Sequence, residues 1–127
     1  MIRSDRRSVL KGAAALAAVG VMPVGPRPGA LAIFIYDGRF AASRELAQAW
    51  LVRGVPVLDP REHDLGLAWR NHIPGLLREG CRIEGATLWS DRFICESFGK
   101  AHGLAPSTHD LALPGPAGLA LRQWTLA

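Results

Sequence analysis

The feature that most constrains the fold is an unbroken apolar run at Leu31–Tyr36, which ends at Asp37. A strand with one face in water alternates apolar and polar residues, whereas a strand covered on both faces is apolar throughout. The run is also rich in β-branched and aromatic residues, which favour strands. It therefore predicts a strand inside a parallel sheet with helices on both sides.

A second strand is expected at residues 55–58, after a helix over residues 40–53 that ends at Gly54. Pro56 cannot donate a hydrogen bond to a neighbouring strand, so this strand belongs at the edge of the sheet. In a flavodoxin-like strand order, 2-1-3-4, the second strand is an edge strand. The position of Pro56 and this topology therefore agree.

The next segment predicts a helix over residues 65–78, capped by Asp64 and kinked or split by Pro74. A third strand is expected at residues 83–89. Ser90 or Asp91 is then expected to cap a further helix, with Phe93, Ile94, Phe98 and Ala101 on its inward face.

The C-terminal residues predict two strands, 108–113 and 119–125, joined by a five-residue Pro/Gly turn. We expect this hairpin to finish the sheet with an antiparallel edge. The predicted fold class is therefore α/β, a three-layer βαβαβα unit with a mostly parallel sheet in the order 2-1-3-4, right-handed at each crossover. Residues 30–127 form this single small domain, and a signal helix precedes it.

Residues 1–29 read as a leader and linker rather than as part of the domain. Paired arginines stand ahead of the apolar run 12–22, which is mostly alanine. A stable membrane span takes about 20 strongly apolar residues, so this run fits a signal-peptide core instead. A Pro/Gly linker at residues 23–29 follows, and Ala30-Leu31-Ala32 is the small-x-small sequence near it, although a cut there would trim the first strand.

The leader resembles a twin-arginine translocation signal, on the residues Arg6, Arg7, Ser8, Val9, Leu10 and Lys11. Arg6 and Arg7 are the pair, and Leu10 and Lys11 match the positions that follow. The resemblance implies that the translocase carries the protein, already folded, to the periplasm or beyond, or leaves it tethered to the membrane by an uncleaved leader. The alternative is a basic, alanine-rich helix of a cytosolic protein.

The basic charge belongs to the leader. Residues 1–32 carry five basic side chains and one acidic one, which accounts for the whole formal net charge of +4. The remainder is balanced, so it lacks the positive surface that binds a phosphate backbone, and no nucleic-acid partner is expected. Contact with a membrane is expected only through the leader.

Cys81 and Cys95 are expected to stay unpaired. A route that carries proteins folded in the reducing cytoplasm argues against a required disulfide, and the predicted elements place the two residues too far apart. A bridge between them is the alternative.

Candidate ligand-binding residues follow the predicted strands. In open α/β sheets, ligands bind beyond the carboxyl ends of the strands, at the point where the strand order reverses. The side chains delivered there are Asp37, Arg39, Asp59, Ser90, Asp91 and Arg92, with Arg61 nearby. Helix N-termini and arginines would suit an anion. The alternative is that the Asp and Ser residues only cap helices.

Other chemical patterns are missing from the sequence. It has no Gly-rich nucleotide motif and no nucleophile elbow around Ser43 or Ser90. Cys95 and His102 lie two helical turns apart, beyond hydrogen-bond reach, and no metal-ligand spacing is present, so no cofactor or metal is expected. The four tryptophans fit core positions, and one left exposed would instead mark an interface.

Two functions remain open. The first is an exported accessory or binding protein, a partner subunit of a larger periplasmic redox enzyme. The second is a small-molecule, anion-binding protein or enzyme that uses the cleft after strands 1 and 3, with Asp37 as acid/base or anchor. A receiver-like domain also begins with a strand and an Asp, but this chain lacks the second acidic pair and the later lysine of that pattern.

Overall fold

The structure is a computed structural model, and it describes residues 30–107 and 110–127. The predicted twin-arginine signal, with Arg6, Arg7, Leu10 and Lys11, lies outside the described residues. Among those that are described, no helix is long and apolar enough to cross a membrane.

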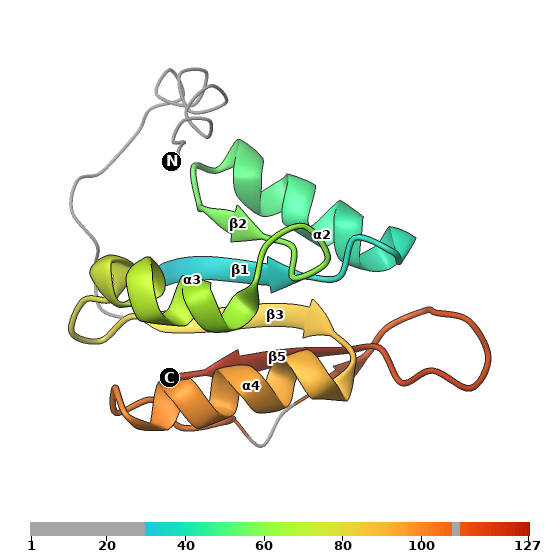
Figure 1. Cartoon of the computed structure of the whole chain (residues 1–127). Coiled ribbons are helices and arrows are strands. Elements are labelled where there is room, and N and C mark those ends of the chain that lie inside the picture. Colours follow the sequence, from blue (N-terminus) through green and yellow to red (C-terminus); the bar gives the residue numbers. More distant parts are fainter. Residues whose placement is uncertain (1–29, 108–109) are drawn as a thin grey trace.

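A five-stranded mixed sheet, in the order β2-β1-β3-β5-β4, carries helices on both faces, which confirms the α/β class (Figure 1). In chain order the elements are β1 (Leu31–Tyr36), α2 (Ala41–Val52), β2 (Val57–Leu58), α3 (Leu65–Asn71), the 3₁₀ helix η1 (Ile73–Leu76), β3 (Arg82–Thr87), α4 (Trp89–Lys100), β4 (Leu111–Ala112) and β5 (Arg122–Leu126).

Strand β1 has the predicted bounds and is buried from both sides. Ile33 and Ile35 belong to the core under α3 and α4, together with Trp69. Phe34 points to the other face and packs against Ala47 of α2. The absence of polar residues in β1 is therefore explained by two cores that meet at this strand.

Strand β2 lies at the edge of the sheet, as Pro56 predicted. It pairs in parallel with β1, and the carbonyl oxygen of Pro56 accepts a hydrogen bond from the Phe34 backbone N–H at 3.0 Å. Proline can accept this hydrogen bond from β1 but has no N–H to donate to a strand on its other side. An edge strand has no such neighbour, so proline loses no hydrogen bond there.

The predicted break at Pro74 is also present. Helix α3 ends at Asn71, and the chain continues as η1 with Pro74 in its first turn. Asp64 caps α3 as expected, because its Oδ1 accepts the backbone N–H of Leu67 at 3.0 Å.

The predicted strand order 2-1-3-4 is right for the parallel strands and wrong for the hairpin. Strand β5, not β4, lies beside β3, and it is antiparallel to it. The described sheet therefore has two parallel and two antiparallel pairings, and the expectation of a mostly parallel sheet is wrong. The side chain of Trp124 covers Gly85, where a Cβ atom would overlap the indole ring, and its Nε1–H donates to Thr87 Oγ1 at 3.0 Å. This contact requires β5 to lie next to β3. The short, exposed strand β4 is therefore the edge strand of the sheet.

The predicted cap of α4 is wrong. Strand β3 ends at Thr87, sooner than expected, and α4 begins at Trp89 with Leu88 at the N-cap and no side-chain cap. Asp91 therefore lies inside the first turn and points inward. Phe93, expected on the inward face, is exposed instead, because the early start of the helix places Asp91, Cys95 and Gly99 on its buried side.

Both cysteines are unpaired, as predicted, and both are buried. Burial raises the pKa of Cys95 to about 12, although a hydrogen bond from Trp69 Nε1–H to Sγ, at 3.5 Å, favours the thiolate. The thiol of Cys95 therefore stays protonated and unreactive at neutral pH.

We expect Gly85→Ala to destabilise the domain by about 2 kcal/mol or more, because the added methyl group must displace the Trp124 ring in a packed core. Urea denaturation monitored by tryptophan fluorescence measures this. The matched control is Gly75→Ala in η1, where a Cβ atom meets nothing within 4 Å. Equal midpoints for the two variants would contradict the proposed β3–β5 packing.

Candidate functional site

Three carboxylates gather where the parallel strands end. Asp37 follows β1, Asp59 follows β2, and Asp91 lies in the first turn of α4 after β3. All three are buried, whereas the side chains of Arg39 and Arg61 reach them from the surface. We call these five residues the carboxylate cluster. The topology creates it, because parallel strands deliver their carboxyl ends to one edge of the sheet.

Asp37 is held by Arg39 in a two-point ion pair. Nη2 and Nε of Arg39 donate to the two carboxylate oxygens at 2.7 and 2.9 Å, and the Arg39 backbone N–H donates at 3.1 Å. Burial raises the pKa of Asp37, but these bonds and the charges of Arg39 and Arg61 outweigh it, so the pKa lies below its ordinary value. Asp37 is therefore a carboxylate at neutral pH.

Ser43 fixes the backbone beneath Asp37, and sequence reasoning missed it. Its Oγ accepts the Asp37 backbone N–H at 2.8 Å and donates to the Ala86 carbonyl oxygen of β3 at 2.6 Å. One hydroxyl thus joins α2 to the ends of β1 and β3. The sequence feature that could have indicated this role is a serine among the apolar residues of the buried face of α2.

Asp59 lies against the backbone of Gly38. One carboxylate oxygen accepts the Arg61 backbone N–H at 2.8 Å, and the other occupies space that a Cβ atom at Gly38 would overlap. Glycine at position 38 therefore lets the Asp59 carboxylate lie directly against the loop that follows β1.

Arg61 connects the loop after β2 to α4. Its Nη2 donates to both oxygens of Asp91, at 3.1 and 3.3 Å. Burial is the largest influence on Asp91 and raises its pKa; Arg61 opposes this, while the charges of Asp37 and Asp59 reinforce it. The pKa values of Asp91 and Asp37 are therefore shifted in opposite directions.

The other two predicted residues take no part in this cluster. Ser90 is exposed at the start of α4. Arg92 points elsewhere: its Nε pairs with Glu96 at 2.7 Å, and its Nη1 pairs with Asp110. The structure thus brings together Asp37, Arg39, Asp59 and Asp91, with Arg61, which was expected nearby, as a fifth member. The Asp-x-Arg pattern occurs twice, at residues 37–39 and 59–61.

The cluster carries more negative than positive charge, because three carboxylates face two guanidinium groups. Both arginines already bind carboxylates, so an incoming anion would have to share them. Within the described residues, no three His, Cys, Asp or Glu side chains are grouped so that they could hold a metal ion.

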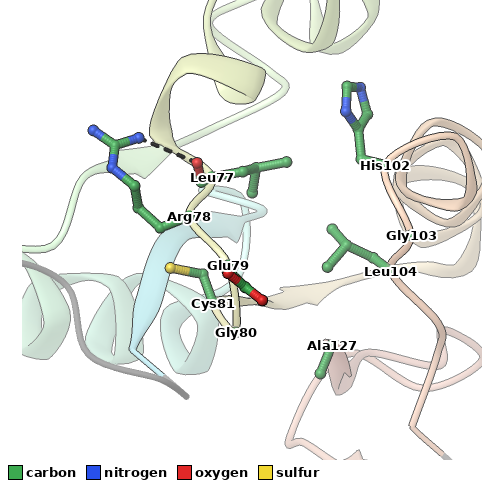
Figure 2. A pocket seen from close by; sticks show the side chains of 9 residues that line it. All are labelled: Leu77, Arg78, Glu79, Gly80, Cys81, His102, Gly103, Leu104 and Ala127. Carbon is green, nitrogen blue, oxygen red and sulfur yellow. Dashed lines mark hydrogen bonds between the residues drawn. The ribbon is translucent and has the colours of Figure 1, made fainter.

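A cavity of about 430 Å³ lies at the opposite end of the sheet, before β3 and after α4 (Figure 2). Residues 77–81, 102–104 and Ala127 line it. His102 also stacks on Trp69, with ring centroids 5.9 Å apart. None of the predicted ligand-binding residues lines this cavity.

An exposed aromatic pair lies on the surface of α4. Trp89 is 66% exposed and Phe93 is 50% exposed, and their rings stack with centroids 4.9 Å apart. Trp69 and Trp124 are core residues as expected, so Trp89 is the tryptophan that departs from the core prediction.

Comparison of the chain with protein-family models, curated proteins and solved structures gave no match.

We expect Asp37→Asn and Asp91→Asn to change stability with opposite pH dependence. The lowered pKa of Asp37 means that its ionised form stabilises the fold, and this contribution is lost as the pH falls through the folded-state pKa. The raised pKa of Asp91 means that its protonated form is favoured, and that contribution is lost as the pH rises through the folded-state pKa.

Urea unfolding from about pH 3 to pH 7 measures both, since ordinary Asp side chains titrate near pH 4. Relative to the wild type, Asp37→Asn should lose stability as the pH rises, and Asp91→Asn should gain it. The exposed Glu62→Gln variant is the control for removing one carboxylate. Parallel pH profiles for the two Asp variants would contradict the described electrostatics.

Proposed function

We propose that this protein is exported in folded form by the twin-arginine translocase. It then acts in the periplasm as a small accessory or binding protein, as a partner subunit of a larger redox enzyme. The observation that carries the binding role is the stacked, solvent-exposed pair Trp89–Phe93 on α4. Partner choice is inferred from the leader resemblance and not from the domain.

Exposed aromatic pairs favour binding for a physical reason. Trp and Phe gain more free energy from leaving water than most side chains, and both are enriched in the buried centres of protein interfaces. Neither ring supports the core here, because both lie on the outer side of α4. Their stacking holds the two rings in one orientation, which lowers the entropy lost on binding.

The charges beside the pair also suit an interface. Arg92 forms ion pairs with both Glu96 and Asp110, so each of these charged groups already has a partner of opposite sign. A partner that covers this surface therefore meets few charges whose hydration it must remove without compensation.

The unpaired cysteines support export in the folded state. The cores are built from packed apolar side chains on both sides of β1, and neither Cys81 nor Cys95 contributes a covalent link. Such a domain needs no oxidising compartment to fold, which matches a route that transports folded proteins.

A second candidate function is small-molecule binding or catalysis at the carboxylate cluster. The opposite pKa shifts of Asp37 and Asp91 favour it, because a buried pair with separated pKa values can supply a base and an acid. Asp37 would be the base or ligand anchor. An anionic ligand would have to compete with Asp37 for Arg39 or with Asp91 for Arg61. An uncharged or cationic ligand therefore fits this site better than an anion.

Capture of the partner tests the binding role. The tagged full chain, isolated from the periplasm of its own host, should bring down a redox enzyme subunit identified by mass spectrometry. Trp89→Ser with Phe93→Ser should reduce the recovered amount at least about tenfold, the loss expected from about 1.4 kcal/mol of binding free energy. Two control variants should leave the recovered amount unchanged. Val52→Ser removes another exposed apolar side chain, on α2, and Asp37→Asn alters the carboxylate cluster.

Equal recovery with all variants would refute a role for the aromatic pair. Loss with Asp37→Asn alone, in a folded variant, would favour the carboxylate cluster instead.

Export is tested separately. Arg6→Lys with Arg7→Lys keeps the charge but removes the paired guanidinium groups, and we expect it to leave the protein in the cytoplasm. Cell fractionation measures this. The control, Arg3→Lys with Arg27→Lys, changes arginines of the same leader outside the pair and should be exported normally. Export of both variants alike would contradict the twin-arginine route.

A further inference from the structure

The outer face of α4 carries one stripe of side chains. Trp89, Phe93, Ser97 and Lys100 follow one another at intervals of four, four and three residues, which places them on the same side of a helix. All four are exposed. The opposite side of α4, at Asp91, Cys95 and Gly99, is buried against the rest of the domain. The stripe therefore remains available to another molecule.

We propose that this stripe binds the same stripe of a second copy, with the two α4 helices antiparallel, and so forms a symmetric dimer. The proposal rests on the binding role proposed above for Trp89 and Phe93, and it adds that a second copy covers them while no other partner is bound.

The order of side-chain sizes along the stripe makes it complementary to itself. One half of it is bulky and aromatic, at Trp89 and Phe93, and the other half begins with the small Ser97. In an antiparallel pair, Phe93 of each copy lies over Ser97 of the other, so the rings fill space instead of colliding. Ser97 Oγ already donates to the Phe93 carbonyl oxygen at 2.9 Å, so covering that hydroxyl leaves no donor unsatisfied.

Charge completes the match. The same antiparallel arrangement brings Lys100 at the end of one helix to Trp89 at the start of the other. An ammonium group over an indole ring is a favourable cation–π contact. Glu96, beside the stripe, is held by Arg92 on its own helix at 2.7 Å, so the two copies bring no unpaired carboxylates together.

The same charges favour a second copy over an anionic lipid surface. Lys100 is the only lysine among the described residues. The guanidinium of Arg92 is already bound by Glu96 and Asp110. A lipid headgroup would therefore find one cation on this face. A two-fold contact between identical stripes also closes on itself, which gives dimers rather than fibres.

The interface is small, because two aromatic rings and their neighbours cover less area than a standard protein interface. We therefore expect a weak dimer, with a dissociation constant in the micromolar range. Binding of the proposed partner enzyme through the same rings would separate the two copies.

Sedimentation equilibrium of the full chain, over about three decades of concentration around the micromolar range, tests the proposal. Trp89→Ser and Lys100→Glu should each raise the dimer dissociation constant at least about tenfold. Lys100→Arg keeps the cation and should change it less than about twofold, as should the exposed control Val52→Ser. Circular dichroism shows that each variant is folded.

A wild-type chain that stays monomeric throughout would overturn the proposal, as would a dimer that survives both Trp89→Ser and Lys100→Glu. So would binding to vesicles of anionic lipid that Trp89→Ser abolishes in the absence of any dimer. Failure here leaves the accessory function standing if the partner is still captured through Trp89 and Phe93. Conversely, a dimer that depends on Trp89 and Lys100, together with no captured partner, would support the dimer and refute the accessory function.

Discussion

The burial of β1 on both faces is the interaction on which the rest of the structure depends. Ile33 and Ile35 anchor the core beneath α3 and α4, and Phe34 anchors the core beneath α2. Full burial of each such side chain contributes about 1.5–3 kcal/mol, which is a large share of the stability of a small domain. Because both cores meet at β1, its end is fixed from two sides, and Asp37 emerges there in a constrained position.

That position explains why a charged group can remain buried at the end of β1. A carboxylate removed from water needs partners that replace its hydration, and Asp37 has Arg39 on both oxygens. The lost hydration of Asp91 is replaced less completely, since the hydrogen bonds from Arg61 to its oxygens are longer. Burial and the charges of Asp37 and Asp59 raise the pKa of Asp91, whereas at Asp37 the hydrogen bonds and charge of Arg39 outweigh burial and lower the pKa.

The sequence was informative where a local property decides the outcome. An unbroken apolar run placed β1, the missing N–H of Pro56 placed β2 at the edge, and Pro74 divided the third helical segment. The ends of parallel strands likewise brought three of the predicted aspartates together. The position of β5 was not predictable in this way, because it depends on Trp124 fitting over Gly85, a contact between residues far apart in the chain.

The same distinction applies to α4, where one boundary changed the role of several residues. The helix begins two or three residues earlier than a cap at Ser90 or Asp91 would give, so Asp91 lies within its first turn instead of capping it. Asp91 is buried there, where Arg61 can reach it, whereas Trp89 and Phe93 are exposed on another side of the helix. The charged site and the aromatic surface are therefore two consequences of one helix start, which β3 determines by ending at Thr87. A change that moved this boundary would alter both together, so the carboxylate cluster and the proposed binding face are physically linked through the first turn of α4.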